Sequence, residues 1–230
     1  DTFLSPGSVE AAWRGAVAAT RAVDLVAGGE ATNAFSAMRP PGHHAETETP
    51  MGFCLLGNAA LAARHALDHH GMGRVAVVDF DVHHGNGTQD ILWDEPNALF
   101  VSSHQMPLWP GTGKPDETGA YGNVMNVPLA PGTDGARMRA VYTGEVFPRL
   151  RAFAPEMIVV SAGFDAHLAD PLAHLEWSEA DFAWLTRELC ALADAICGGR
   201  LVSVLEGGYD LEALARSARA HVSELKEAAG

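Results

Sequence analysis

Residues 74–84 read RVAVVDFDVHH, a short run of β-branched residues that passes directly into two carboxylates and two imidazoles. An apolar run of this length, preceded by Gly73 and ended by charge, is typical of a buried parallel strand. Similar runs lie at 98–103, 157–162 and 200–205. Helical patterns separate these runs, at residues 8–27, 56–70, 135–153, 178–197 and 210–226. This alternation predicts an α/β fold, with one parallel sheet flanked by helices on both faces.

Polar residues follow three of the predicted strands at the point where each strand ends. The strand at 74–80 continues into DVHH, the strand at 157–162 into Gly163-Phe164-Asp165, and the strand at 200–205 into EGGY. Ligands of parallel sheets bind at the carboxyl ends of the strands. We therefore expect these three segments to meet at one edge of the sheet.

The spacing Asp79-x-Asp81-x-His83 indicates a metal site. Residues two apart in an extended segment point the same way, so the three side chains share one face while Phe80 packs behind them. Buried like charges repel, and a divalent cation relieves that repulsion. Asp165, after a strand with no other charge, is the best third ligand beside Asp81 and His83, which leaves a position for water as catalytic zinc requires. Because this ligand set is harder than most zinc sites, the ion could also be Fe²⁺ or another divalent ion. The alternative to a metal site is an exposed acidic turn.

Two further segments carry groups suited to proton transfer. His43 and His44 follow the stiff segment RPPG, and histidine titrates near neutral pH. An ordinary surface loop is the alternative for this pair. His69 and His70 end a helix, where cationic side chains suit the dipole, and we assign them no chemistry. Tyr209 follows a flexible Gly-Gly turn, so its hydroxyl either stabilises an oxyanion or belongs to a half-buried turn residue.

Composition limits the classes of partner. The chain carries 29 acidic and 15 basic residues, a net charge of -14, which argues against a nucleic-acid partner. This charge favours cationic substrates through steering, although solubility alone also accounts for it. No segment approaches the ~18 uninterrupted apolar residues of a membrane helix, and the first residues do not read as a signal peptide. The three cysteines form no CxxC pair, so we expect a cytoplasmic protein without disulfides.

Other familiar catalytic motifs do not fit. The segment GTGK at 111–114 lacks the spacing of a phosphate loop, and Pro115 stands where Ser or Thr is needed. No GxSxG nucleophile elbow occurs, and no GxGxxG follows the first strand.

Six ordered motifs together resemble the histone deacetylase and acetylpolyamine amidohydrolase superfamily, in its class II-like bacterial branch. They are RPPGHHA at 39–45, GFC at 52–54, DFDVHHGNGTQ at 79–89, SSHQ followed by PGTG between 102 and 113, SAGFDAH at 161–167 and LEGGYDL at 205–211. The resemblance implies an arginase-deacetylase-like sheet. It also implies that residues 1–230 are a single deacetylase-like catalytic domain without the usual N-terminal segment, in which these relatives carry a His-Pro-Glu-Arg-like sequence.

The resemblance also implies roles for individual residues. It implies zinc bound by Asp81, His83 and Asp165, and a substrate carbonyl polarised by Tyr209. A weakly active relative carries His at that last position, so the tyrosine favours catalysis.

The tandem histidines then correspond to the catalytic pair of this superfamily. The resemblance implies that His44 is the principal general acid and base and that His43 tunes the water and the electrostatics. Asp79 would orient His43, and Asn86 would orient His44.

Phe53 and Trp109 match the aromatic walls of the acyl-lysine channel, where Trp109 is bulkier than the usual Phe or Tyr. We expect Gly52 and Leu172 to line the same channel, and a polyamine-selective relative carries Glu at the place of Leu172, which mildly disfavours polyamines. The resemblance further implies a structural K⁺ held mostly by backbone oxygens of Asp79, Asp81, His83, Ser102 and Ser103.

The leading hypothesis is a zinc-dependent amidohydrolase that removes an acetyl or other acyl group from the amine of lysine or of a small amine. A catalytically weak or inactive module that binds acylated ligands is the alternative, as is an acetylpolyamine deacetylase. A ureohydrolase-like enzyme with two metals would need a second acidic cluster. The identity of the acylated amine and the formation of a homo-oligomer are left open by the sequence.

Overall fold

Six parallel strands form one sheet in the computed structural model, which describes residues 2–230. The spatial order is β1-β6-β5-β2-β3-β4, and every neighbouring pair is parallel. The strands are β1 (Asn33–Ser36), β2 (Val75–Asp79), β3 (Ala98–Gln105), β4 (Val124–Leu129), β5 (Met157–Ala162) and β6 (Leu201–Leu205). The chain therefore has the predicted parallel α/β architecture.

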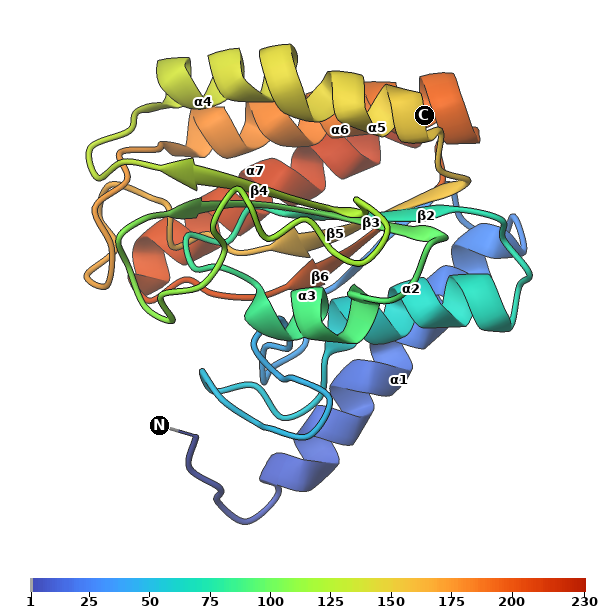
Figure 1. Cartoon of the computed structure of the whole chain (residues 1–230), viewed down its shortest axis with the longest axis horizontal. Coiled ribbons are helices and arrows are strands. Elements are labelled where there is room, and N and C mark those ends of the chain that lie inside the picture. Colours follow the sequence, from blue (N-terminus) through green and yellow to red (C-terminus); the bar gives the residue numbers. More distant parts are fainter. Residues whose placement is uncertain (1) are drawn as a thin grey trace.

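Helices cover both faces of the sheet. Figure 1 shows α1, α2 and α3 below the sheet and α4, α5 and α6 above it, while α7 packs against α6 and the edge strand β1. The helices are α1 (Ser8–Ala27), α2 (Asn58–Asp68), α3 (Asn86–Leu92), α4 (Gly135–Val141), α5 (Phe147–Phe153), α6 (Glu179–Cys197) and α7 (Leu211–Ala228). Among residues 2–230, no helix combines the length and the hydropathy that a membrane span requires.

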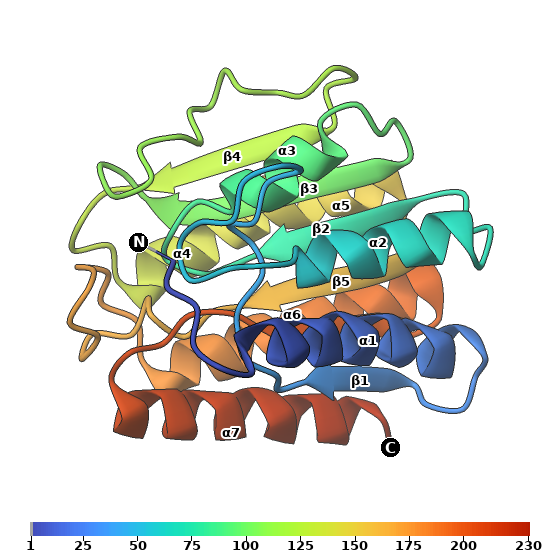
Figure 2. The same ribbon diagram turned by 90° about the horizontal axis from the view of Figure 1, so that it is seen from below.

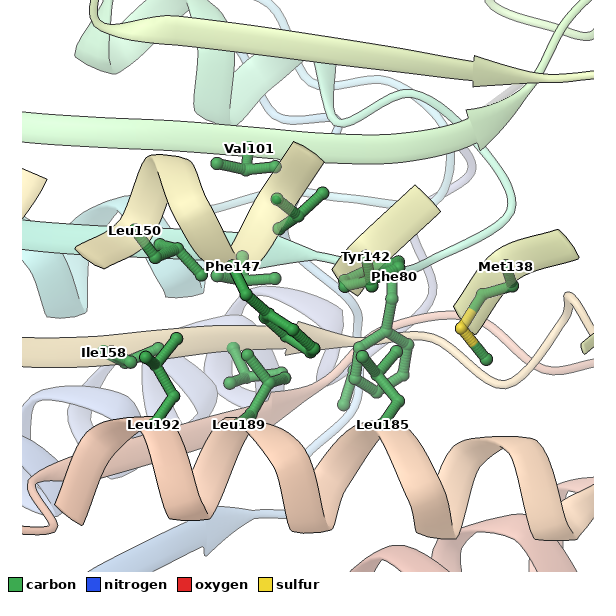
Figure 3. Close-up of a cluster of buried hydrophobic side chains, with 14 of the residues drawn as sticks. Phe80, Val101, Met138, Tyr142, Phe147, Leu150, Ile158, Leu185, Leu189 and Leu192 are labelled. Atoms are coloured by element: carbon green, nitrogen blue, oxygen red, sulfur yellow. The ribbon is translucent and has the colours of Figure 1, made fainter. Parts of the chain in front are cut away.

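Alternating side chains of the central strands build two cores. Val75 and Val77 pack with α1 and α2 on one face, whereas Ala76 and Val78 pack with the helices on the other. A strand buried on both faces needs this continuous apolar sequence, as the run in β2 has. Figure 3 shows the larger core, where Leu185 and its neighbours on α6 meet apolar side chains from the sheet and from α4 and α5.

The predicted elements at 8–27, 157–162 and 178–197 agree with the structure, and Ser178 caps α6 in a capping box with Asp181. The predicted helix at 135–153 is interrupted by a π-helical turn, Tyr142–Val146. The sequence patterns missed β1, β4 and α3 for physical reasons. β1 has four residues, β4 lies at the sheet edge and so tolerates Pro128, and α3 has only seven residues.

Candidate metal centre and active site

Three adjacent strands deliver the candidate site residues to one edge of the sheet. β6, β5 and β2 are neighbours, and their carboxyl ends continue into the segments that hold Tyr209, Asp165 and Asp81. The structure brings Asp81, His83 and Asp165 together, with one ligand atom from each within 4.8 Å of the others. All three side chains are buried.

Hydrogen bonds hold these three side chains in place. His83 Nδ1 lies 3.1 Å from Asp81 Oδ1 and 3.1 Å from Asp165 Oδ2. The backbone N–H of Gly207 donates to Asp81 Oδ2 at 2.8 Å, and that of Val82 donates to Asp165 Oδ1 at 2.9 Å. Backbone donors from the segments after β6 and β2 thus fix the orientation of both carboxylates without a metal ion.

The charges of this group suit a cation. Burial, reinforced by the charge of Asp81, raises the pKa of Asp165 to about 7. Burial opposes protonation of His83, but the adjacent Asp165 and Asp81 outweigh it and raise the pKa of His83 to about 10. Two buried carboxylates and one imidazole therefore demand positive charge, and oxygen and nitrogen donors of this kind fit zinc or another divalent ion.

The tandem histidines lie beside this group, and each has a partner. His43 Nδ1 is 2.9 Å from Asp79 Oδ2, and His44 Nδ1 is 2.8 Å from Asn86 Oδ1. The two imidazole centroids are 3.9 Å apart. The second nitrogen of His43 lies 3.7 Å from Asp81 Oδ1, so the pair borders the candidate metal ligands directly.

The surroundings shift the pKa values of the two histidines in opposite directions. Burial opposes protonation of His43, but Asp81 and Asp79 outweigh it and raise the pKa of that imidazole. Burial lowers the pKa of His44, and the neighbouring His43 lowers it further. One member of the pair therefore keeps a proton at neutral pH while the other is free to accept one.

A pocket opens above these groups. Its walls include the predicted channel residues Gly52, Phe53, Trp109 and Leu172, and its floor includes His44, His83 and Tyr209. The ring of Trp109 lies 4.6 Å from that of His44, and the ring of Phe53 lies 6.1 Å from that of Tyr209.

Gly52 is required by this packing. Its φ is +56°, and a Cβ there would lie 2.4 Å from the His44 ring and 2.6 Å from Trp109. The close approach of its backbone to both rings therefore needs a residue without a side chain.

Tyr209 reaches the floor of the pocket from the turn after β6. Burial, reinforced by Asp165 and Asp81, raises the pKa of its phenol, so the hydroxyl keeps its proton and can donate a hydrogen bond. Its backbone N–H donates to Asp170 Oδ2 at 2.8 Å, which fixes the turn.

Three residues of the predicted K⁺ site occupy neighbouring positions of β2 and β3. The β2–β3 register pairs Asp79 with Ser102, and Ser103 follows on β3. Both serines are buried, and their hydroxyls are bonded to His104 and Tyr142.

The sequence patterns assigned no role to the buried carboxylate of Glu206. It is fully buried and accepts hydrogen bonds from the backbone N–H groups of Gly42 at 2.7 Å and His43 at 3.1 Å. Arg39 donates to its backbone carbonyl, so the loop of the tandem histidines is tied to the end of β6. Its position directly after a buried strand, like that of Asp165, was the signal that could have identified it.

Comparisons with known proteins identify the family of this chain. The histone deacetylase domain family matches residues 1–225. The chain is 44% identical over 221 residues to histone deacetylase 14, chloroplastic, of Arabidopsis thaliana, and 43% identical over 213 residues to a histone deacetylase-like amidohydrolase of Pseudomonas aeruginosa. A crystal structure of the HDA15 HD domain matches with a TM-score of 0.92 and 37% identity, covering 98% of this chain and 64% of that one.

The matched relatives are longer than this chain. The alignments cover 94% of this chain but 51% of the Arabidopsis protein, and 91% of this chain but 56% of the Pseudomonas protein. The predicted parallel fold and the predicted family are both confirmed. By its match over nearly the whole sequence and by its shared fold, this chain belongs to the histone deacetylase family.

Proposed function

We propose that this chain is a metal-dependent amidohydrolase that removes an acetyl or other acyl group from the amine of lysine or of a small amine. One observation carries the proposal. Asp81, His83 and Asp165 converge in one buried group, and His83 lines a pocket together with His44 and Tyr209. A cation site, a proton acceptor and a hydrogen-bond donor in one pocket are the groups that amide hydrolysis needs.

Asp81, His83 and Asp165 would hold the metal ion, with zinc preferred and Fe²⁺ or another divalent ion as alternatives. When bound, such an ion supplies Lewis acidity and lowers the pKa of a water molecule. The three side chains are pre-oriented for this role, because backbone N–H groups already hold both carboxylates.

The tandem histidines move the protons. His44, whose pKa burial lowers, takes the proton of the attacking water and later gives it to the leaving amine. Asn86 holds its ring in the orientation that this transfer needs. His43, held by Asp79, keeps its proton and supplies positive charge beside the reaction.

Tyr209 donates its hydroxyl proton in a hydrogen bond to the acyl oxygen as that oxygen gains negative charge. The raised pKa of the phenol keeps this donor protonated. A single donor of this kind contributes about 10²–10³ in turnover in other enzymes.

The walls of the pocket fit an acylated alkyl amine. Phe53 and Trp109 offer apolar faces for an alkyl chain, and Gly52 lets Trp109 lie close to His44. Leu172 at the rim lacks the charge that would bind a second amine, so we favour acetyl-lysine or a small acetylated amine over an acetylpolyamine. The net charge of -14 favours a cationic substrate and disfavours nucleic acid.

Three further assignments remain proposals. Asp79, Asp81, His83, Ser102 and Ser103 would hold a structural K⁺. Residues 1–230 would act as one catalytic domain. A reducing compartment such as the cytoplasm suits the three cysteines, all of which are free and buried.

The test is the substitution Tyr209→Phe, assayed on an acetyl-lysine peptide with metal content measured on the same sample. We expect turnover to fall by about 10²–10³ while the metal stays bound. Tyr121→Phe is the matched control, because Tyr121 is 63% exposed and outside the pocket. Turnover of Tyr209→Phe equal to that of the control would remove Tyr209 from the mechanism. A metal-loaded wild type that binds the peptide without cleaving it would refute hydrolysis and favour an acyl-ligand binding module.

The substrate is tested separately. A panel of acetyl-lysine peptides, longer acyl-lysine peptides and acetylpolyamines should give the highest kcat/KM with an acyl-lysine peptide. A preference for acetylpolyamines would contradict the assignment that rests on Leu172.

A further inference from the structure

A second group of metal-ligating side chains lies far from the active site. It consists of Asp24, His65, His69 and His70, which we call the histidine cluster. One ligand atom from each of the four lies within 4.8 Å of the others. Asp24 Oδ1 is 2.7 Å from His65 Nε2 and 2.9 Å from His70 Nε2. The rings of His65 and His69 are stacked with centroids 4.7 Å apart.

The cluster is at the edge of the sheet opposite the active site. Asp24 belongs to the last turn of α1, and the histidines belong to the last turn of α2 and the residues after it. Both helices end shortly before a parallel strand begins, so their ends lie at the amino edge of the sheet. Figures 1 and 2 show the two helices side by side beneath the sheet.

The chemistry of the cluster is that of a metal site. His65 and His69 are four apart, which places them on one face of the helix. Three imidazoles and one carboxylate are a ligand set of borderline hardness, suited to Zn²⁺, Cu²⁺ or Ni²⁺ rather than to Mg²⁺ or Ca²⁺. The carboxyl ends of α1 and α2, where the helix dipoles are negative, also favour a cation at this place.

The geometry needs little rearrangement to bind an ion. Ligands about 2.0–2.1 Å from a tetrahedral ion are about 3.3 Å from one another. The two hydrogen-bonded contacts must therefore open by about half an ångström, and no other pair needs to close by more than about 1.5 Å. Rotation of side chains that lie at the surface can supply both changes. His69 is exposed and the other three are half-buried, so an ion can reach the cluster from solvent.

We propose that the histidine cluster is a second metal site, which binds a borderline divalent ion and clamps the end of α1 to the end of α2. This site does not depend on the proposed hydrolase activity, because it shares no residue with the active site. Without a metal, the same contacts are a hydrogen-bonded surface cluster around Asp24, and the two accounts differ in the number of ions that the chain binds.

The experiment counts Zn²⁺ ions bound by the full chain after removal of metal with a chelator. Calorimetric titration should give two ions for the wild type and one for the double variant His69→Ala/His70→Ala, with affinity at the second site lowered by at least ~10²-fold. His174→Ala is the matched control, because it removes an exposed histidine outside both sites and should still bind two. Asp24→Asn, which preserves size, provides a second variant if the double variant folds poorly by circular dichroism.

A paramagnetic probe separates this site from the active site. Cu²⁺ added to the variant His83→Ala, which lacks an active-site ligand, should still broaden the NMR signals of His65, His69 and His70. One ion bound by the wild type, with these signals unchanged, would overturn the proposal. An equal number of ions in the wild type and in the double variant would overturn it as well.

Discussion

Gly207 lies where the two carboxylates of the candidate metal site meet, and replacing it tests the whole site without removing a ligand. A Cβ at this position would lie 2.2 Å from Asp165 Oδ2 and 2.6 Å from Asp81 Oδ2. Ordinary contact begins at 3.4 Å, so Gly207→Ala must push one or both oxygens away by about 1 Å.

The size of the effect follows from the tolerance of metal coordination. Ligand distances in metal sites hold to within about 0.2 Å, so a displacement of about 1 Å disrupts the site. Changes in the groups that orient metal ligands lower affinity by about 10–100-fold, and we expect the upper end of that range or more here. Turnover on an acetyl-lysine peptide should fall at least in proportion to the lost metal.

The assay measures zinc affinity by chelator competition and turnover on the same sample of Gly207→Ala. Gly144→Ala is the matched control, since a Cβ there meets nothing within 4 Å and Gly144 lies at an exposed position on the helical layer. Circular dichroism and urea denaturation show whether each variant is folded. Wild-type zinc affinity in a folded Gly207→Ala would refute the claim that Asp81 and Asp165 bind one ion together.

Three more predictions concern protons and positioning. In the metal-free chain the pKa of His83 is about 10, so zinc must displace a proton from this imidazole. The apparent affinity for zinc should therefore rise about tenfold per pH unit between pH 7 and 9. A zinc affinity that is constant over this range would contradict the role of His83 as a ligand. Burial lowers the pKa of His221 to about 3, below the unfolded value of 6.5, so the folded chain binds fewer protons than the unfolded chain between these pH values. The contribution of His221 to the unfolding free energy therefore falls by about 1.4 kcal/mol per pH unit as the pH drops from 6.5 towards 3. Urea denaturation of chelator-treated protein measures this pH dependence. His221→Gln should reduce the slope of the unfolding free energy against pH by the equivalent of about one proton. An unchanged slope would show that His221 is not the group responsible. Glu206→Ala leaves the backbone N–H groups of Gly42 and His43 without an acceptor and should lower the unfolding free energy by about 1–3 kcal/mol for each group. The amide oxygen of Glu206→Gln can accept both hydrogen bonds, so this variant should keep most of the unfolding free energy. Equal losses in the two variants would contradict this account.

Local sequence was sufficient for the fold class and for the outline of the site. The run at 75–79 is apolar at every position before its carboxylate, which is typical of a strand buried on both faces, and β2 is one of the two central strands of the sheet. Because parallel strands present their carboxyl ends at one edge, Asp81 and Asp165 could be expected to meet although 84 positions separate them in the chain.

Tertiary structure alone decided the partnerships across the chain. Glu206 supports the loop of His43 through backbone groups, which carry no signal in the sequence. The sequence pattern assigns His69 and His70 only to the end of a helix, because the pattern of one helix contains no information about its neighbour. Only the packing of α1 against α2 brings Asp24, 41 positions before His65, within hydrogen-bonding distance of it. Periodicity and strand ends are local properties that a sequence displays, whereas the meeting of two helix ends depends on how the whole sheet is covered.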